Sequence, residues 1–165
     1  MRQKRFIVTA FACYIALLVW LVIFKLEFNP ANLPRYRQLI FIPFSERSGI
    51  SKSAVMEELV MNVLAFIPLG VYLSALEKPK KAWARVLVGF CLSLVFELLQ
   101  FAFAIGTTDV TDLINNTLGT LLGVLLFALL RKLLKEKAAV VSAAVLLALQ
   151  AFAFGGYVFL SLANI

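Results

Sequence analysis

Five long apolar segments decide what this chain can fold into. They are residues 6–24, 59–76, 86–105, 113–130 and 138–165, and Glu97 is the one charged residue inside them. About 20 apolar residues in a helix cross the hydrocarbon core of a bilayer, which is about 30 Å thick. The sequence therefore predicts an all-α fold, a polytopic transmembrane helical bundle of about five helices.

The connections between these segments leave little room for a soluble domain, so we expect one membrane domain over residues 1–165. The predicted helices lie near 6–24, 56–76, 84–104, 110–130 and 138–161, with a long loop at 25–55. The first apolar run exceeds the roughly 7–15 residues of a signal-peptide core and no small-residue cleavage pattern follows, so we expect it to remain as a helix. The last segment contains Gly155 and Gly156, which leaves a tilt, a break or an exposed tail open.

Composition excludes several classes of chemistry. The chain has no histidine, and its two cysteines, Cys13 and Cys91, both lie in apolar segments. Histidine-based nucleophile pairs and the usual zinc spacings are therefore absent, and no disulfide is indicated. We expect no metal and no cofactor. With 62% hydrophobic residues, the net charge of +7 does not indicate a nucleic-acid partner.

The basic residues instead predict the orientation of the chain, because Lys and Arg near helix ends tend to stay cytoplasmic. Eleven of the sixteen lie in segments 1–5, 77–85 and 131–137, and five lie in the loop 25–55. This asymmetry predicts a cytoplasmic N-terminus and an external C-terminus. Residues 39–44 in the long loop are too short to span, so we expect them to pack on the bundle, lie along the interface or dip back into the protein.

Five polar residues of the second to fourth predicted helices share one depth, roughly 4–11 Å below the outer boundary at 1.5 Å per residue: Asn62, Glu97, Gln100, Asp112 and Asn116. Ser74 and Ser93 are exceptions in these helices. Polar side chains are costly in a bilayer and usually face other helices or a wet cavity. We therefore predict a polar pocket near the outer leaflet. Its candidate binding residues are Asn62, Glu97, Gln100, Asp109, Asp112 and Asn116, with Arg35 and Arg37 from the loop.

Structural explanations exist for most of these residues. Asp109 and Asp112 are suited to cap the fourth helix, and the amides are suited to hydrogen bonds between helices. Glu97 is a lone carboxyl group inside a span, which favours a functional site. It is expected either to be neutral or to pair with Arg35 or Arg37.

Four further residues predict how the helices pack. Pro68 is expected to bend the second helix, two residues before Gly70. Gly119 and Gly123 form a G-x-x-x-G pattern, which lets a neighbouring helix approach closely. The same stripe is a candidate contact for an oligomer.

Three blocks containing these residues resemble the VanZ-like family of bacterial membrane proteins. Residues 62–70 match N-x-x-x-F-x-P-x-G, residues 97–100 match E-x-x-Q, and residues 109–119 match D-x-x-D-x-x-x-N-T-x-G. Residues 39–44 are similar to the family's N-L-x-P-F element without its asparagine. Many members carry an arginine just before the last block, where this chain has Gly-Thr-Thr at 106–108. Any role of such an arginine in binding phosphate at the membrane edge is therefore in doubt here or has moved to Arg35 or Arg37.

The resemblance implies a multi-pass protein of the bacterial cytoplasmic membrane linked to resistance to the glycopeptide teicoplanin. The leading hypothesis is a non-enzymatic protein that binds an envelope lipid, a lipid-linked precursor or a lipoglycopeptide. A second is a membrane hydrolase or transferase using Glu97 as acid or base, with Asp109 and Asp112 as its partners or as Mg²⁺ ligands. A small lipid transporter or scramblase is a third, and a structural subunit of a membrane complex is a fourth.

Overall fold

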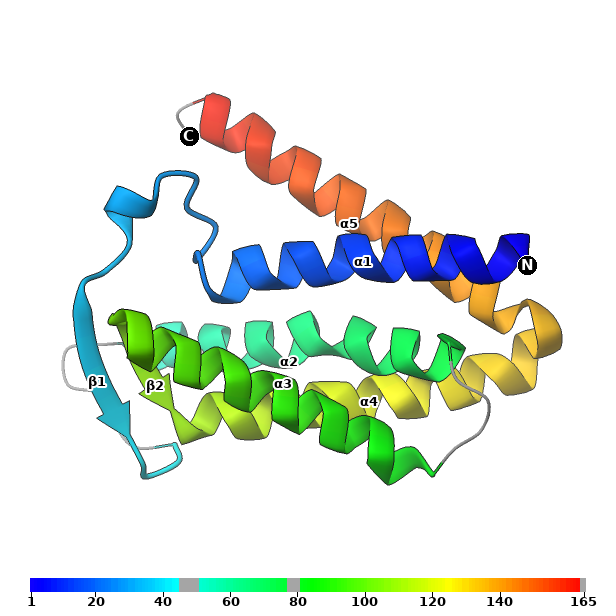
Figure 1. Ribbon diagram of the computed structural model, residues 1–165, viewed down its shortest axis with the longest axis horizontal. Coiled ribbons are helices and arrows are strands. Elements are labelled where there is room, and N and C mark those ends of the chain that lie inside the picture. Colours follow the sequence, from blue (N-terminus) through cyan, green and yellow to red (C-terminus); the bar gives the residue numbers. More distant parts are fainter. Residues whose placement is uncertain (45–50, 77–80, 164–165) are drawn as a thin grey trace.

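A computed structural model describes residues 1–44, 51–76 and 81–163. Five α-helices dominate it (Figure 1): α1 Arg2–Val22, α2 Lys52–Leu76, α3 Ala82–Phe103, α4 Val110–Leu134 and α5 Ala138–Leu162. Their positions agree with the predicted segments, although α1, α2 and α3 begin a few residues earlier. Five of the charged residues that were counted for the predicted orientation and charge balance lie outside the described residues: Glu46, Arg47, Glu77, Lys78 and Lys80.

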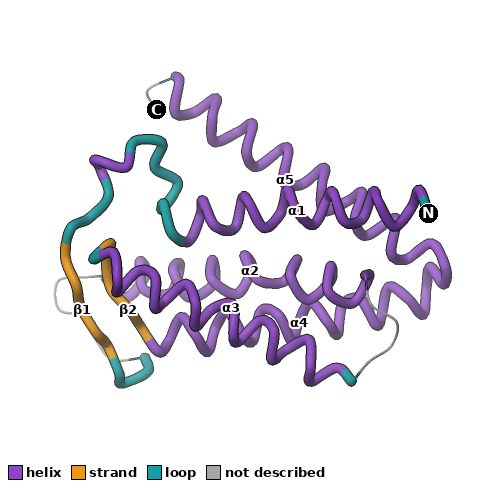
Figure 2. The backbone as a smooth tube through the Cα atoms, viewed as in Figure 1, coloured by secondary structure: helices purple, strands orange, loops and turns teal. Residues whose placement is uncertain are grey.

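Within the described residues, four helical runs are long and apolar enough to cross a membrane. They are α1, α2, α3 and the run Val110–Leu162, in which the short 3-10 helix Lys135–Lys137 joins α4 to α5. The chain is therefore a mostly helical membrane protein. Successive helices run back and forth, so the N-terminus and the α4–α5 corner lie at one end of the bundle (Figure 2). The C-terminal ends of α1, α3 and α5 lie at the other end.

A two-stranded parallel sheet at this second end departs from the all-α prediction. Strand β1 (Tyr36–Ile40) pairs with β2 (Ile105–Asp109), and Gln38 is opposite Thr107. The chain between α3 and α4 is extended, and extended backbone leaves polar groups that need partners in an apolar environment. The preceding loop supplies them as β1. Residues 36–40 thus form a strand, whereas we expected residues 39–44 to pack on the bundle, lie along the interface or dip back into the protein.

The closest helix packing is between α2 and α4, at three glycines. A Cβ added to Gly70 would lie 2.7 Å from the Val124 nitrogen, and one added to Gly123 would lie 3.0 Å from Gly70 Cα. A Cβ on Gly119 would overlap the backbone of α2 in the same way. The predicted close approach is confirmed. Because α2 covers this stripe, it is not open to a second copy in this structure.

The helices α1 and α5 form a second layer over this pair. Tyr14 of α1 donates its hydroxyl to the Ala65 carbonyl oxygen at 2.8 Å, three residues before Pro68. A proline inside a helix disturbs the carbonyl groups of the preceding turn, so an outside donor is well placed there. The helix α5 is continuous through Gly155 and Gly156, and its C-terminal half diverges from α1 (Figure 1).

Candidate functional site

Glu97 lies on α3 beside the sheet and is almost completely buried, with 5% of its surface exposed. Its Oε2 accepts a hydrogen bond from the backbone nitrogen of Asp109 at 3.0 Å, and its carbonyl oxygen accepts one from Thr108 Oγ1 at 3.2 Å. Its electrostatic neighbours include Asp112, Asp109 and Lys25. The carboxyl group therefore holds β2 against α3, and this burial argues against direct contact with a substrate.

The two aspartates mark the start of α4. Asp109 is the N-cap residue, and its Oδ1 accepts from the backbone nitrogen of Thr111 at 2.7 Å. This confirms the capping interpretation for Asp109. Asp112 lies in the first turn, and its Oδ1 accepts from Asn62 Nδ2 at 2.6 Å. This bond joins α4 to α2, so Asp112 also contributes to helix packing.

The remaining amides also join helices. Gln100 donates to the Val22 carbonyl oxygen at 2.9 Å, which ties α3 to the last turn of α1. Asn116 donates to Ser93 Oγ at 2.9 Å, which ties α4 to α3. The hydrogen bonds thus support the interhelical interpretation of these side chains. The group will be called the polar network: Asn62, Ser93, Glu97, Gln100, Asp109, Asp112 and Asn116.

The sequence did not single out Asn115, which is 94% buried on α4 beside Asn116. In the described part of the chain, its Nδ2 and the Asn116 Oδ1 have no hydrogen-bond partner. The two adjacent asparagines in the sequence were the signal that could have identified Asn115 as a candidate site residue. Across the described residues, no group of three or more His, Cys, Asp and Glu side chains is placed to hold a metal ion. The Mg²⁺ alternative therefore gains no support from this geometry.

The two loop arginines have separate positions, and the bonds of Arg37 go to α3 rather than to Glu97. Arg37 Nε and Nη2 donate to the carbonyl oxygens of Phe101 and Ala102 at 2.9 and 3.0 Å. Its guanidinium also lies 5.6 Å from the centre of the Phe101 ring. The final carbonyl groups of a helix lack partners within the helix and favour a cation. Arg37 is therefore a C-terminal cap of α3, and its bonds do not support the pairing with Glu97 that was one of the alternatives.

Arg35 instead lines a cavity of about 470 Å³ at the sheet end of the bundle. This space will be called the Arg35 cavity. Its walls come from the end of α1, the loop before β1, and the α3–β2 junction: Ile23, Phe24, Leu33, Pro34, Phe103, Ala104 and Ile105. Seven of its eight residues are apolar, so one exposed cation stands on an otherwise apolar lining.

Lys25 lies against Gly106, in the segment 106–108 that precedes the last motif block. A Cβ added to Gly106, whose φ is +132°, would lie 2.7 Å from Lys25 Nζ. Lys25 follows α1 and reaches β2, where the resembling family often has an arginine. The sequence left open whether the role of that arginine is in doubt or has moved to Arg35 or Arg37, and the structure adds Lys25, whose ammonium group lies beside Gly106. The sequence could not predict this, because 81 positions separate Lys25 from Gly106.

Comparisons with known proteins agree with the motifs. The VanZ/LLP1 family profile matches residues 11–131, which include the polar network and the Arg35 cavity. Protein VanZ of Enterococcus faecium is 41% identical over 115 residues, which is 66% of this chain and 65% of that protein. The match thus covers less than two thirds of the relative's length. No solved structure matches significantly. On the extent of the profile match, this chain belongs to the VanZ/LLP1 family.

Proposed function

We propose that this protein of the bacterial cytoplasmic membrane lowers susceptibility to glycopeptide antibiotics by binding a lipid-anchored ligand in the Arg35 cavity. The ligand is an envelope lipid, a lipid-linked precursor or the lipoglycopeptide itself. The observation that carries the proposal is one arginine on the rim of an apolar cavity of about 470 Å³. The family membership and the similarity to Protein VanZ supply the link to resistance.

The lining suits an amphiphile with an anionic head. A guanidinium presents paired donors to a phosphate or carboxylate, and its charge does not depend on pH in the physiological range. The ring of Phe103 and the side chains of Ile23 and Ile105 offer an apolar surface to a lipid tail. Ligand sites commonly combine a mostly apolar wall with a few polar groups that fix orientation.

In this proposal the polar network has a supporting role, which differs from the polar pocket expected from the sequence. Each cavity wall is attached through a hydrogen bond described above. Gln100 fixes the end of α1, Arg37 fixes the end of α3, and Glu97 fixes β2. Side chains that make these bonds keep the cavity open by holding three elements at fixed distances, without touching the ligand themselves.

We further propose five spans with a cytoplasmic N-terminus and an external C-terminus. The basis is the distribution of basic residues, eleven of which lie in segments assigned to the cytoplasmic side. The +7 net charge divides into +9 on that side, −1 on the outside and −1 from Glu97. The Arg35 cavity then faces the outer leaflet, where lipid-linked precursors and the drug are accessible.

The test is antibiotic susceptibility in a bacterium that lacks the protein. Expression should raise the minimal inhibitory concentration of teicoplanin, and Arg35→Ala should remove the effect while membrane levels stay normal. Arg35→Lys should retain part of it, because the charge remains but the paired donors do not. Arg131→Ala, at the last turn of α4 on the opposite end, is the control and should behave as wild type. Full resistance with Arg35→Ala would contradict the proposal.

A further inference from the structure

The end of the bundle away from the sheet carries a dense group of positive charges. Residues 1–5 and 131–137 together hold seven of the sixteen basic residues of the chain and one acidic residue, Glu136. The first segment begins α1, and the second ends α4 and forms the corner before α5 (Figure 1). All seven basic side chains are exposed. This surface will be called the basic corner.

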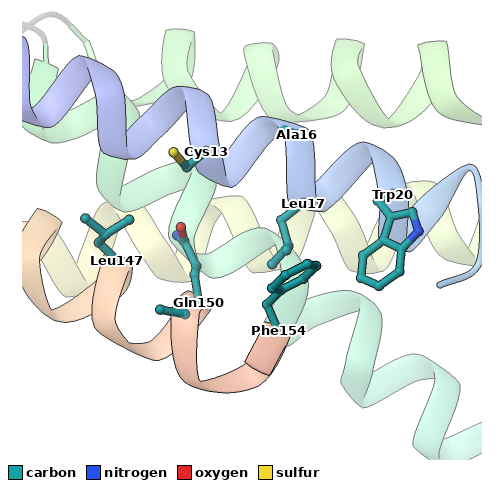
Figure 3. A pocket seen from close by; sticks show the side chains of 8 residues that line it. Cys13, Ala16, Leu17, Trp20, Leu147, Gln150 and Phe154 are labelled. Atoms are coloured by element: carbon teal, nitrogen blue, oxygen red, sulfur yellow. The ribbon is translucent and has the colours of Figure 1, made fainter. Parts of the chain in front are cut away.

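The two segments are held together because α1 packs against α5 at this end. Ile7 of α1 is buried in one apolar cluster with Ala143 of α5, and Ala138, directly after the corner, is 1% exposed. Farther along the two helices, Leu17 and Phe154 point toward one another beside an open groove (Figure 3). The backbones on both sides of the basic corner are therefore anchored in the core, while the basic side chains remain at the surface.

Lys135, within the basic corner, has a backbone conformation that favours glycine. It ends α4 with a φ of 51° and a ψ of −123°, and its N–H donates to the Arg131 carbonyl oxygen. Residues with a side chain rarely adopt a positive φ, whereas glycine adopts it readily and is common where a helix ends. Lysine at this position therefore strains the backbone. Strain of this kind is found at sites that bind ligands, so we looked for a role of the ammonium group.

The positive charges of the basic corner are not neutralised within the described chain. Among residues 1–44, 51–76 and 81–163, no acidic side chain forms an ion pair with any of the seven. Lys132 and Lys135 are three positions apart, as are Arg2 and Arg5. Like charges at this spacing are neighbours on a helix surface and repel one another. An anion bound among these side chains would remove the repulsion.

The position of the basic corner decides which anion is available. The helix α1 is long and apolar enough to cross a membrane, so its basic start lies at a bilayer surface, and the α4–α5 corner lies at the same end. Clusters of about four to eight Lys and Arg residues beside a span attract anionic lipid head groups. Phe6 follows the first basic segment, Val141 follows the second by one turn, and both are exposed. These apolar side chains favour an anion that carries acyl chains over a soluble one.

We propose that the basic corner binds an anionic phospholipid, whose phosphate is held by Lys135 together with the basic residues at the start of α1. Leu133, two positions before Lys135, faces another side of α4 and takes no part. The tendency of basic residues to stay cytoplasmic explains on which side they lie. It does not explain why lysine stands at a position that favours glycine, whereas lipid binding does. The site is independent of the Arg35 cavity, and it would stand if the proposed function or the proposed orientation failed.

Native mass spectrometry of the full chain in detergent measures this binding. The probes are dioleoylphosphatidylglycerol and dioleoylphosphatidylcholine, which share their acyl chains and a phosphate but differ in net charge. We expect phosphatidylglycerol to bind with the lower dissociation constant. Lys135→Gly should raise this constant about fivefold, as the loss of one cation at a membrane surface implies, and should leave phosphatidylcholine binding unchanged. The same variant should keep or raise the temperature midpoint of unfolding, because glycine relieves the strain.

Three further variants check the assignment. Lys135→Arg keeps the charge and should bind phosphatidylglycerol like the wild type. Lys52→Gly, at the first residue of α2 and the sheet end of the bundle, is the matched control and should not change lipid binding. If Lys135→Gly does not fold, Lys4→Gln on α1 decides through the same fivefold loss.

Three outcomes would overturn the proposal. The first is equal affinity of the wild-type protein for the two lipids. The second is the same loss of phosphatidylglycerol binding in Lys52→Gly as in Lys135→Gly. The third is displacement of the lipid by an equal concentration of glycerol phosphate, which carries the anionic group without acyl chains and would identify the ligand as a soluble anion.

Discussion

A buried carboxyl group in a membrane helix can serve chemistry or architecture, and the surroundings of Glu97 favour architecture. Its Oε2 accepts the backbone nitrogen of Asp109, which is itself the N-cap of α4. One side chain thus fixes the position of β2 and the start of the next helix. The strictest requirement at this position is an acceptor, not a proton donor or a nucleophile.

Two substitutions at Glu97 separate these roles. Glu97→Gln keeps an acceptor oxygen and should retain wild-type membrane levels and teicoplanin resistance. Glu97→Leu leaves the Asp109 N–H without a partner and should lower the free energy of unfolding by about 1–3 kcal/mol. Thermal unfolding in detergent and the inhibitory concentration measure the two effects. Full loss of resistance in a stable Glu97→Gln protein would instead favour the enzyme hypothesis.

For single residues, the sequence predicted which side chains belong to the site, but it did not predict their contacts. Hydropathy placed Asn62, Glu97 and Asn116 at one depth, and the structure links Asn62 to Asp112 and Asn116 to Ser93. The partners could not be predicted, because helical periodicity does not give the rotation of one helix against another. The contact of Lys25 with Gly106 could not be predicted either, because it depends on the path of the loop after α1.

Among the elements, the α2–α4 pair has the most restrictive contact. The Gly123 position faces the backbone of α2 at Ile67 and Gly70, so a side chain there has no space. Gly155 on α5 has no atom within 4 Å of an added Cβ. These two glycines therefore form a matched pair for substitution.

Gly123→Leu should destabilise the bundle by roughly 1–3 kcal/mol or more, because overpacking forces the two helices apart. Gly155→Leu should leave stability unchanged or slightly improved, since leucine has the higher helix propensity. The temperature midpoint of unfolding in detergent compares the two variants. Equal destabilisation by both substitutions would show that α2 and α4 do not pack as described.

The helices and the glycine contact could be predicted from the sequence, whereas the sheet could not. Apolar length defines a spanning helix locally, and G-x-x-x-G indicates close packing. The strands Tyr36–Ile40 and Ile105–Asp109 are each five residues long and far apart in the chain. Each strand is stabilised in its extended form only by hydrogen bonds to the other strand. We therefore did not predict the sheet from the sequence.

For the molecule as a whole, the arrangement of helix ends agrees with the proposed orientation. The N-terminus and the α4–α5 corner, both rich in basic residues, lie at the same end of the bundle (Figure 1). Cysteines introduced as Gln38→Cys and Lys132→Cys, each in a Cys13→Ala/Cys91→Ala background, can be labelled with an impermeant maleimide. We expect Gln38→Cys to react in intact cells and Lys132→Cys only after permeabilisation. The reverse labelling pattern would show the opposite orientation, with the N-terminus outside.

The central claim is that the Arg35 cavity binds a lipid-anchored ligand, and photo-crosslinking in living cells tests it most directly. Benzoylphenylalanine is placed at Phe103, in the cavity wall, or at Leu133 near the opposite end of the bundle, and both native side chains are 69% exposed. After irradiation, mass spectrometry should find a lipid-linked envelope precursor, an anionic envelope lipid or teicoplanin attached at position 103, and Arg35→Ala should remove this adduct. The same adducts at both positions, or an adduct at position 103 that survives Arg35→Ala, would contradict the account.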